Sequence, residues 1–331
     1  MESIRVSVGT AAILGLLKCK LDAIPTTAYF MTYTSKGCTA NCAFCAQART
    51  SHAPADRLSR VTWPTFPFSQ VLQTFSEQKK HLPFKRICIQ TILYPGLKKD
   101  LLLIVRLIRK STLHLPISIA IPPMSETFLR QLKELGVDRV AISLDAVTPE
   151  LFHVIKGSKV NGPFTWVNHL SALETTKNIF GSDRTTTHLI VGLGETEEEA
   201  VTLFQQLTDQ GITVGLFAFT PLPGTRLAKH SSPSLGQYRR LQLAHYLIKN
   251  NMARVNQMTF DSSEQRLIDF GLEQDTLNKI IQKGDAFKTS GCQSCNRPFF
   301  TERPGGPLYN FPVLPSPSQL IEIQQQLGGE L

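Results

Sequence analysis

The sequence predicts an α/β fold in which six strand–helix units form a partial barrel. From about residue 28, short β-rich runs alternate with helical stretches, which is the pattern of parallel strands wrapped by helices. Helix start signals stand between the strands. Small and polar residues occupy alternate positions of two strands, which indicates a cavity inside the barrel.

Each element of this prediction has its own signal. The β-rich runs place strands at residues 28–34, 86–92, 117–121, 139–146, 187–193 and 213–220. Ser125 precedes the helical stretch "ETFLRQLKELG", and Thr148–Pro149–Glu150 begins another helix. Thr196 and Glu199 form a capping box before a third.

Strand periodicity predicts which side chains face inward, because successive residues of a strand point to opposite faces. In "RVAISLDA" the residues expected to face the helices are Val140, Ile142 and Leu144. The residues expected to face inward there are Ala141, Ser143 and Asp145. In "RICIQTI", Ile87 and Ile89 should face out, and Cys88 and Gln90 should face in.

Three regions are expected along the chain. Residues 1–25 form an N-terminal extension, which includes an apolar run at 11–17 that we interpret as structural because no basic region precedes it. Residues 26–225 form the barrel. Residues 226–331 contain helices and a tail rich in Gly, Pro and Asn, which is expected to be a loop.

Composition narrows the class of protein. With 42% hydrophobic and 18% charged residues among 331, a globular domain is expected, and no apolar run is long enough to span a membrane. The net charge of +9 favours an acidic partner. Lys79–Lys80 and Lys98–Lys99 are short basic pairs, so nucleic acid is not expected as a partner. Seven unevenly spaced cysteines do not resemble a disulfide framework and predict a reducing compartment, the cytoplasm.

A cysteine triplet follows the first strand in "GCTANCAFCAQAR", at Cys38, Cys42 and Cys45. Three thiolates on one short loop can hold three irons of a cubane cluster and leave the fourth iron open. A structural zinc site is a poorer match because it takes four ligands, usually as two separated pairs. The aromatic Phe44 before the last cysteine supports the iron–sulfur interpretation.

With this triplet, residues 26–225 resemble the radical S-adenosylmethionine (SAM) superfamily, and the expected fold becomes a partial (βα)6 TIM-like barrel. The resemblance implies a [4Fe-4S] cluster whose open iron binds SAM. One electron, from a donor such as ferredoxin or flavodoxin, then cleaves SAM to a 5'-deoxyadenosyl radical. The cofactor carries the difficult chemistry, and the protein orients it and excludes water.

Two further motifs are similar to those of biotin synthase, lipoyl synthase and their relatives. "VGLGET" is a turn whose Gly192 and Gly194 would let a ligand approach the backbone. "SLDAVTPE" resembles the fourth barrel strand of those enzymes, which implies that Asp145 and Ser143 hold the SAM ribose. The alternative for Asp145 is a helix-capping carboxylate.

A second cysteine pair, Cys292 and Cys295, lies in the tail stretch "KTSGCQSCNRPFF". Biotin synthase holds a second cluster with cysteines of its second, third and fifth strands, and this chain has only the second-strand one, Cys88. Folded over the barrel mouth, the tail pair could join Cys88 to hold a second [4Fe-4S] cluster. A redox dithiol and half of a zinc knuckle are the alternatives. Cys19 is expected to be a small buried hydrophobe.

The tail, the triplet and "LDAVTPELF…KG" together resemble the two-component lipoyl synthases. That resemblance implies sulfur insertion into a protein-bound octanoyl chain, with the second cluster as sulfur donor and Ser290 as a further candidate ligand. The implied partners are an octanoylated lipoyl carrier domain or H protein and a homologous sister subunit. Biotin synthase, another thioether- or methyl-transferring enzyme of the superfamily, and a non-catalytic iron–sulfur carrier are the alternatives. His169 and His188 are interpreted as structural.

Overall fold

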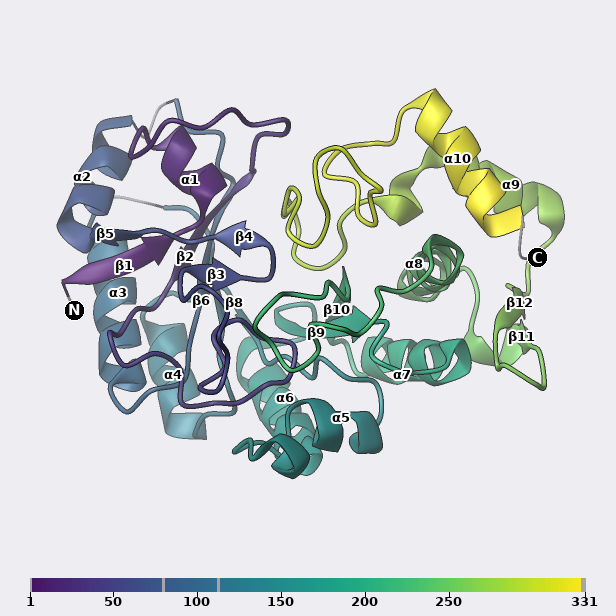
Figure 1. The fold of residues 1–331 in the computed structure, drawn as a ribbon, viewed down its shortest axis with the longest axis horizontal. Coiled ribbons are helices and arrows are strands. Elements are labelled where there is room, and N and C mark those ends of the chain that lie inside the picture. The colour runs from purple at the N-terminus through teal and green to yellow at the C-terminus, as the bar shows by residue number, and fades with distance from the viewer. Residues whose placement is uncertain (1, 79–80, 112–113, 329–331) are drawn as a thin grey trace.

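The protein has a mostly parallel central sheet with helices packed on its outer face (Figure 1). A computed structural model describes residues 2–78, 81–111 and 114–328, so the predicted pair Lys79–Lys80 lies outside the described residues. All six predicted strands are confirmed, each parallel to the next, in the order β2 (Thr27–Met31), β6 (Arg86–Gln90), β7 (Ile117–Ala120), β8 (Arg139–Ala141), β9 (Thr185–Val191) and β10 (Thr213–Ala218). The predicted partial barrel is therefore present.

The N-terminal extension is part of this sheet. β1 (Ser3–Val6) pairs antiparallel with β2 and with β5 (Thr65–Pro67), and these two strands extend the sheet beyond β2. The apolar run at 11–17 is structural, as predicted, and overlaps α1 (Val8–Ile13). Because β1 takes the hydrogen-bonding edge of β2, that edge is covered.

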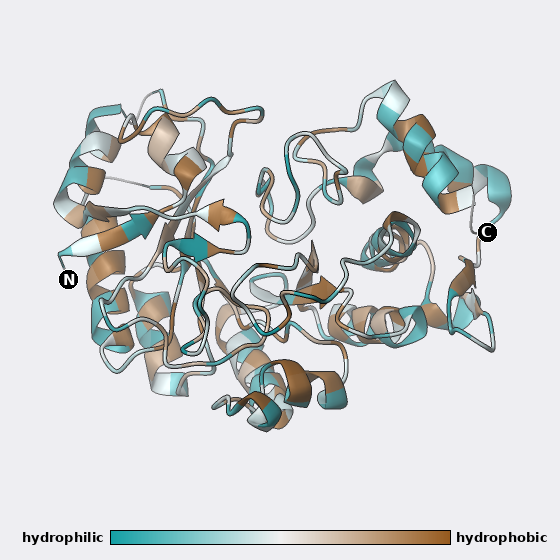
Figure 2. Cartoon of the chain, viewed as in Figure 1, coloured by the Kyte–Doolittle hydropathy of each residue, from teal (hydrophilic) through white to brown (hydrophobic). Residues whose placement is uncertain are grey.

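Helices α3 (Leu97–Lys110), α4 (Glu126–Glu134), α6 (Trp166–Phe180) and α7 (Glu197–Asp209) cover the sheet, with α2 (Phe68–Gln78) beside β5. The predicted capping box of α7 is present at Thr196 and Glu199. Thr148 caps α5 (Pro149–Ile155), and Ser125 stands at the N-cap of α4 without a side-chain cap bond. Figure 2 shows hydrophobic residues along the strands and these helices. Outward-facing strand residues such as Ile87 and Val140 are buried in this core, as predicted.

Smaller elements complete the chain. β3 (Arg57–Leu58) and β4 (Val61–Thr62) form a hairpin, and η1 (Ser158–Val160) follows α5. The C-terminal region contains α8 (Leu235–Lys249), η2 (Val255–Gln257), the pair β11 (Thr259–Phe260) and β12 (Leu267–Asp269), α9 (Gln274–Lys283), η3 (Asp285–Phe287) and α10 (Pro317–Gly328). The described part of the chain has no helix long and apolar enough to cross a membrane.

Residues 288–316, here called the tail, lie against both edge strands of the six-stranded parallel part. Thr26, just before β2, donates to Asn296 Oδ1 at 3.0 Å, and Asn296 donates to the carbonyl of Ile24 at 2.9 Å. At the other edge, the β10 residue Leu216 donates to Ser290 Oγ at 2.8 Å. The tail therefore closes the gap between the first and last parallel strands, which refines the expectation that it folds over the barrel mouth.

Candidate active site

One cavity of about 280 Å³ lies between the inner faces of the parallel strands, the loop after β2 and the tail. We call it the central cavity. Six of the seven cysteines line it: Cys38, Cys42, Cys45, Cys88, Cys292 and Cys295. The inward-facing strand residues Gln90, Ser143 and Asp145 line it too, so the face predicted for them is confirmed.

Cys38, Cys42 and Cys45, here called the loop trio, are positioned by a loop with many internal ties. Asn41 donates to the carbonyl of Val160 at 2.6 Å, and its Oδ1 accepts from Thr50 Oγ1 at 2.7 Å. Gln47 donates to the carbonyl of Ala55 at 2.6 Å and accepts from Arg5 at 2.7 Å. The loop geometry is thus fixed by buried polar contacts on both sides of the trio.

The three thiols of the loop trio are suited as ligands of an iron–sulfur cluster. Burial raises the pKa of Cys42 and raises that of Cys45 to about 12, and it also raises the pKa of Cys38. Buried thiolates need a compensating cation, and soft thiolates favour iron–sulfur clusters. Among the described residues, no three His, Cys, Asp or Glu side chains lie close enough to share one metal ion. Thiolates of a cubane bind different irons and are spaced more widely.

Cys88 of β6 and the tail residues Cys292 and Cys295, here called the split trio, meet in the same cavity. Cys88 and Cys295 pack against the same hydrophobic cluster, and Ser118, the strand partner of Cys88, places its Oγ 3.9 Å from Cys292 Sγ. Burial, and then the charges of Cys295 and Cys292, raise the pKa of Cys88. Tyr29 Oη lies 3.1 Å from Cys295 Sγ, and Gln90 donates to Cys88 Sγ at 3.1 Å. The predicted meeting of these thiols is observed; their role as ligands remains a prediction.

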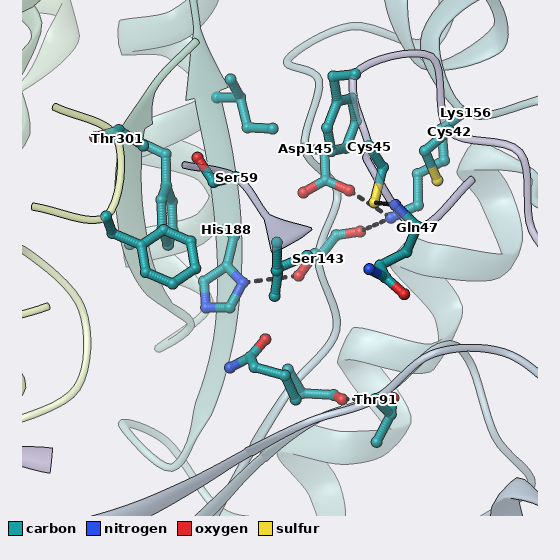
Figure 3. A pocket seen from close by; sticks show the side chains of 18 of the residues that line it. Cys42, Cys45, Gln47, Ser59, Thr91, Ser143, Asp145, Lys156, His188 and Thr301 are labelled. Carbon is teal, nitrogen blue, oxygen red and sulfur yellow. Dashed lines mark hydrogen bonds and ion pairs between the residues drawn. The ribbon is translucent and has the colours of Figure 1, made fainter. Parts of the chain in front are cut away.

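The other predicted site residues of the strands surround a buried lysine. Lys156, between α5 and η1, donates to Asp145 Oδ2 and to the carbonyl of Ser143, both at 2.6 Å (Figure 3). Ser143 Oγ lies 2.8 Å from His188 Nδ1. Because Asp145 pairs with Lys156 and Thr148 caps α5, the helix-capping alternative for Asp145 is wrong. Its predicted role toward the SAM ribose is untested.

The glycine turn after β9 differs from the prediction. Gly192 and Gly194 are not among the residues that line the central cavity. The carboxylate of Glu195 accepts from the backbone N–H groups of Gly192 at 2.5 Å and Leu193 at 2.9 Å. Gly192 has φ +98°, and a Cβ there would lie 2.6 Å from Pro233 Cδ. Close packing therefore explains Gly192, and the open backbone expected at this turn is already occupied by Glu195.

Phe44 and Ser290 both line the central cavity. Phe44 lines the central cavity and packs against a small cluster of Ile155, Leu193 and Phe219. Ser290 also lines the cavity, with its Oγ accepting from Leu216. Their predicted contributions to SAM and cluster binding remain predictions.

Several cavity residues were not predicted. Lys156 has no local signal, because its contact with Asp145 forms only when the segment after α5 packs against the inner face of the sheet. Arg297 follows Cys295 by two residues and places its guanidinium 3.8 Å from the centre of the Phe217 ring. His188 alternates with Thr186 and Ile190 on the inner face of β9, so strand periodicity could have found it. Burial, and then the charges of Arg297 and Lys156, lower the pKa of His188 to about 3, so its ring is neutral near pH 7.

His169 also lines the cavity, but its surroundings are those of a packed core residue. Its ring makes edge contacts with Phe152 at 4.9 Å and Phe164 at 5.2 Å between ring centres. Nδ1 lies 3.0 Å from the carbonyl of Thr165. Cys19, in contrast, is exposed rather than buried, since it lies in the irregular segment after α1.

Comparison with known proteins identifies the class. The model of the radical SAM superfamily matches residues 32–207, which is more than half of the chain, and the chain therefore belongs to that superfamily. The family implies a [4Fe-4S] cluster and SAM. No curated protein sequence matches the chain.

Solved structures with this fold include a methylornithine synthase, with a TM-score of 0.51, 16% identity and 69% of this chain covered. The FeFe-hydrogenase maturase HydG from Carboxydothermus hydrogenoformans has a TM-score of 0.51, 17% identity and 68% of this chain covered. A radical SAM methyltransferase from Sphaerobacter thermophilus has a TM-score of 0.50, 16% identity and 67% covered. The matched regions span 63%, 52% and 64% of those chains, less than two thirds of each. At these identities the likeness concerns the fold.

Proposed function

We propose that this radical SAM enzyme inserts sulfur into a protein-bound octanoyl chain, as one component of a lipoyl synthase pair. The observation that carries the proposal is that the loop trio and the split trio line one cavity. Unactivated C–H carbons offer no acidic proton and no leaving group, so a carbon radical is needed to replace hydrogen with sulfur. Two thiol sets facing one substrate are what such a reaction requires.

Each trio has its own part in the proposal. Cys38, Cys42 and Cys45 would hold a [4Fe-4S] cluster that, together with bound SAM, supplies a 5'-deoxyadenosyl radical. Cys88, Cys292 and Cys295 would hold a second [4Fe-4S] cluster, which is a reactant here because it donates sulfur and is consumed. Ser290 is the candidate for a further ligand of this sulfur donor.

The polar groups between the trios would bind and orient SAM. Asp145 is held by Lys156, so its carboxylate is fixed in position as an acceptor for hydroxyl groups. Ser143 is oriented in turn by the neutral ring of His188. Rigid side chains of this kind position a reactive group more accurately than flexible ones.

The rest of the lining suits an alkyl chain. Apolar and aromatic side chains line the central cavity between the trios, among them Ile92, Leu93, Ile121, Ile190, Phe217 and Phe300. Such a lining excludes water from a carbon radical. The third parallel strand, β7, presents Ser118 and Ala120 in place of the biotin-synthase cysteine.

The test offers an octanoyl-lysine peptide to the anaerobically reconstituted enzyme with SAM and a one-electron reductant. Mass spectrometry should show sulfur added to the peptide and one 5'-deoxyadenosine formed for each hydrogen removed. The sister protein is added in a parallel reaction, since one component alone could stop at a single sulfur.

Three results would contradict the proposal. Sulfur added to dethiobiotin in place of the octanoyl peptide would make the chain a biotin synthase. Methyl transfer from SAM would assign it to the methyltransferases of the superfamily. Cluster binding with no SAM cleavage under any condition would make it an iron–sulfur carrier.

A further inference from the structure

A second cavity of about 260 Å³, here called the side cavity, adjoins the central one. Three residues line both cavities: Tyr29, Arg297 and Phe300. The side cavity is enclosed by α1 and the segment 19–25, by the β3–β4 hairpin and by tail residues 297–304. Segments from both ends of the chain therefore meet around it, as Figure 1 shows for the purple N-terminal segment and the yellow-green tail.

The β3–β4 hairpin separates the two cavities. Leu58 and Ser59 line the central cavity, whereas Arg60, Val61 and Thr62 line the side cavity. Phe300 completes the wall, with edge contacts to Phe217 at 5.8 Å and to Trp63 at 6.4 Å between ring centres. Tyr29, Arg297 and Phe300 have atoms on both spaces, so the two cavities share one wall at these residues.

The interior of the side cavity is suited to an acyl chain and an amide. Its apolar wall consists of Val8, Leu21, Pro25, Val61, Phe299 and Phe300. Thr62, Asp22 and the buried Glu302 add a few polar groups among these apolar side chains. A mostly apolar lining with few polar groups is typical of a small-molecule site.

Arginines cluster where the side cavity opens. Arg60 lines it, Arg57 belongs to the same β3–β4 hairpin, and Arg303 stands in the chain between the lining residues Glu302 and Pro304. After burial, the charge of Arg303 lowers the pKa of Arg60, the charge of Glu302 raises it and the charge of Arg57 lowers it. Arg57 and Arg303 are exposed, and within residues 2–78, 81–111 and 114–328 none of the three arginines makes an ion pair. The three guanidinium groups outnumber the two carboxylates that line the side cavity, Asp22 and Glu302, so this region favours an anionic partner.

From these observations we infer that the side cavity is the route by which the acyl-lysine arm of a carrier protein enters the central cavity, and that an acidic face of that carrier docks on Arg57, Arg60 and Arg303. The inference rests on the proposed function, since it names where the protein-bound substrate of that reaction docks. An acidic protein face fits better than nucleic acid because three arginines do not make a long basic stripe of the kind that follows a phosphate backbone.

The first experiment measures docking by charge reversal. The variant carries Arg57→Glu and Arg303→Glu, and the matched control carries Lys99→Glu and Arg106→Glu, two exposed residues of α3. Both variants lower the net charge equally. Binding of an octanoylated, acidic lipoyl carrier domain, followed by fluorescence anisotropy at low salt, should weaken about tenfold or more in the first variant and less than about twofold in the control. Equal weakening in both would overturn the docking surface.

A peptide separates this inference from the proposed function. A short, uncharged octanoyl-lysine peptide should be converted equally by the parent and by the Arg57→Glu, Arg303→Glu variant. If the parent converts neither the octanoyl peptide nor the octanoylated carrier domain, the proposed function is wrong. The anisotropy measurement would still decide whether the carrier docks on the arginines. An RNA that binds the parent and loses affinity in the variant, with unchanged carrier binding, would assign the arginines to nucleic acid instead. If the charge-reversed variant fails to fold, Arg57→Gln with Arg303→Gln should give a smaller loss in the same direction.

The second experiment obstructs the route. Cys19 is exposed and lines the side cavity, so a bulky maleimide can be attached there in the cluster-loaded enzyme, where the other cysteines are occupied as ligands. Labelled parent should convert the octanoyl peptide at least about tenfold more slowly, while reductive SAM cleavage without substrate stays unchanged. Cys19→Ser treated with the same reagent is the control. Unimpaired conversion by the labelled parent would show that the acyl chain enters elsewhere.

Discussion

The loop trio and the split trio use the same ligand chemistry but are assembled in opposite ways. Cys38, Cys42 and Cys45 stand on one loop of eight residues, tied by hydrogen bonds of Asn41 and Gln47 to the surrounding chain. Cys88 lies in a strand and its partners Cys292 and Cys295 lie in the tail, with some two hundred intervening residues. The loop trio is therefore a local structure, whereas the split trio exists only when the tail is docked between β2 and β10.

This difference suits a persistent cluster on the loop trio and a consumed cluster on the split trio. A site that must persist through many turnovers benefits from local, rigid ligands. A site whose cluster is consumed must be emptied and refilled, and displacement of the tail would take two of the three thiols of the split trio away together. The two trios should consequently respond differently to the same kind of substitution.

The largest effect is expected from Cys42→Ala. Loss of one of three local ligands should remove the SAM-binding cluster, and reductive SAM cleavage should fall by about a thousandfold or more. The measurement is 5'-deoxyadenosine formation, with Cys19→Ser as the matched cysteine variant that keeps parental activity. SAM cleavage within about tenfold of the parent in Cys42→Ala would mean that the loop trio is not the cluster site.

Cys292→Ala should separate the two halves of the reaction. Because the tail does not contact the loop trio through Cys292, SAM cleavage should stay within about twofold of the parent while sulfur addition to the octanoyl peptide disappears. The two products are measured in one assay. Loss of both activities to the same extent would show that the trios form one site and not two.

Lys156→Met should destabilise the loop-trio side of the cavity. The pair of Lys156 with Asp145 is buried, with 8% and 12% of the side chains exposed, and removal of one partner leaves an uncompensated charge. We expect a loss of about 3–5 kcal/mol in the free energy of unfolding, measured by anaerobic urea denaturation. The exposed pair of Arg130 and Glu126, at 61% and 57%, is the control, and Arg130→Met should cost less than about 1 kcal/mol. A similar loss in both variants would contradict this ranking.

Glu302→Gln should change how the free energy of unfolding depends on pH. Burial raises the pKa of Glu302 from 4.5 to about 7, although Thr301 and Arg297 oppose the rise. Between those values the folded protein binds the proton more tightly than the unfolded chain, so stability falls as pH rises from about 4.5 to 7. Between pH 5 and 8 the free energy of unfolding of the parent should fall by up to about 3 kcal/mol because of Glu302. The Glu302→Gln variant should lack this fall. Parallel stability curves for the two proteins would contradict the raised pKa.

Much of the barrel could be predicted from the sequence because its signals are local. The six parallel strands, the capping box at Thr196 and the inward direction of Cys88 and Asp145 follow from periodicity and short-range chemistry. β1 was missed because a strand of four residues has little periodicity and forms only by pairing with β2 and β5. α10 was missed because it follows a long Gly- and Pro-rich tail.

Of the site, the ligand candidates were predictable and their environment was not. The spacing of Cys38, Cys42 and Cys45 is visible in the sequence. The inward direction of Cys88 and the cysteine pair in the tail predict that Cys292 and Cys295 meet Cys88 over the barrel mouth. Lys156 and Arg297 influence these groups through contacts between distant elements, which no local pattern encodes, whereas the inward direction of His188 follows from the period of β9. At Gly192 the φ of +98° and the close packing against Pro233 explain the glycine, and its predicted contribution to SAM binding stays a prediction.

Iron and sulfide analysis of the anaerobically reconstituted protein tests the two-trio account most directly. The account predicts about eight irons and eight sulfides per chain in the parent, and about four of each in Cys42→Ala, in Cys88→Ala and in Cys292→Ala. About four irons in the parent, unchanged by replacement of Cys88 or Cys292, would contradict it and leave a single cluster on the loop trio.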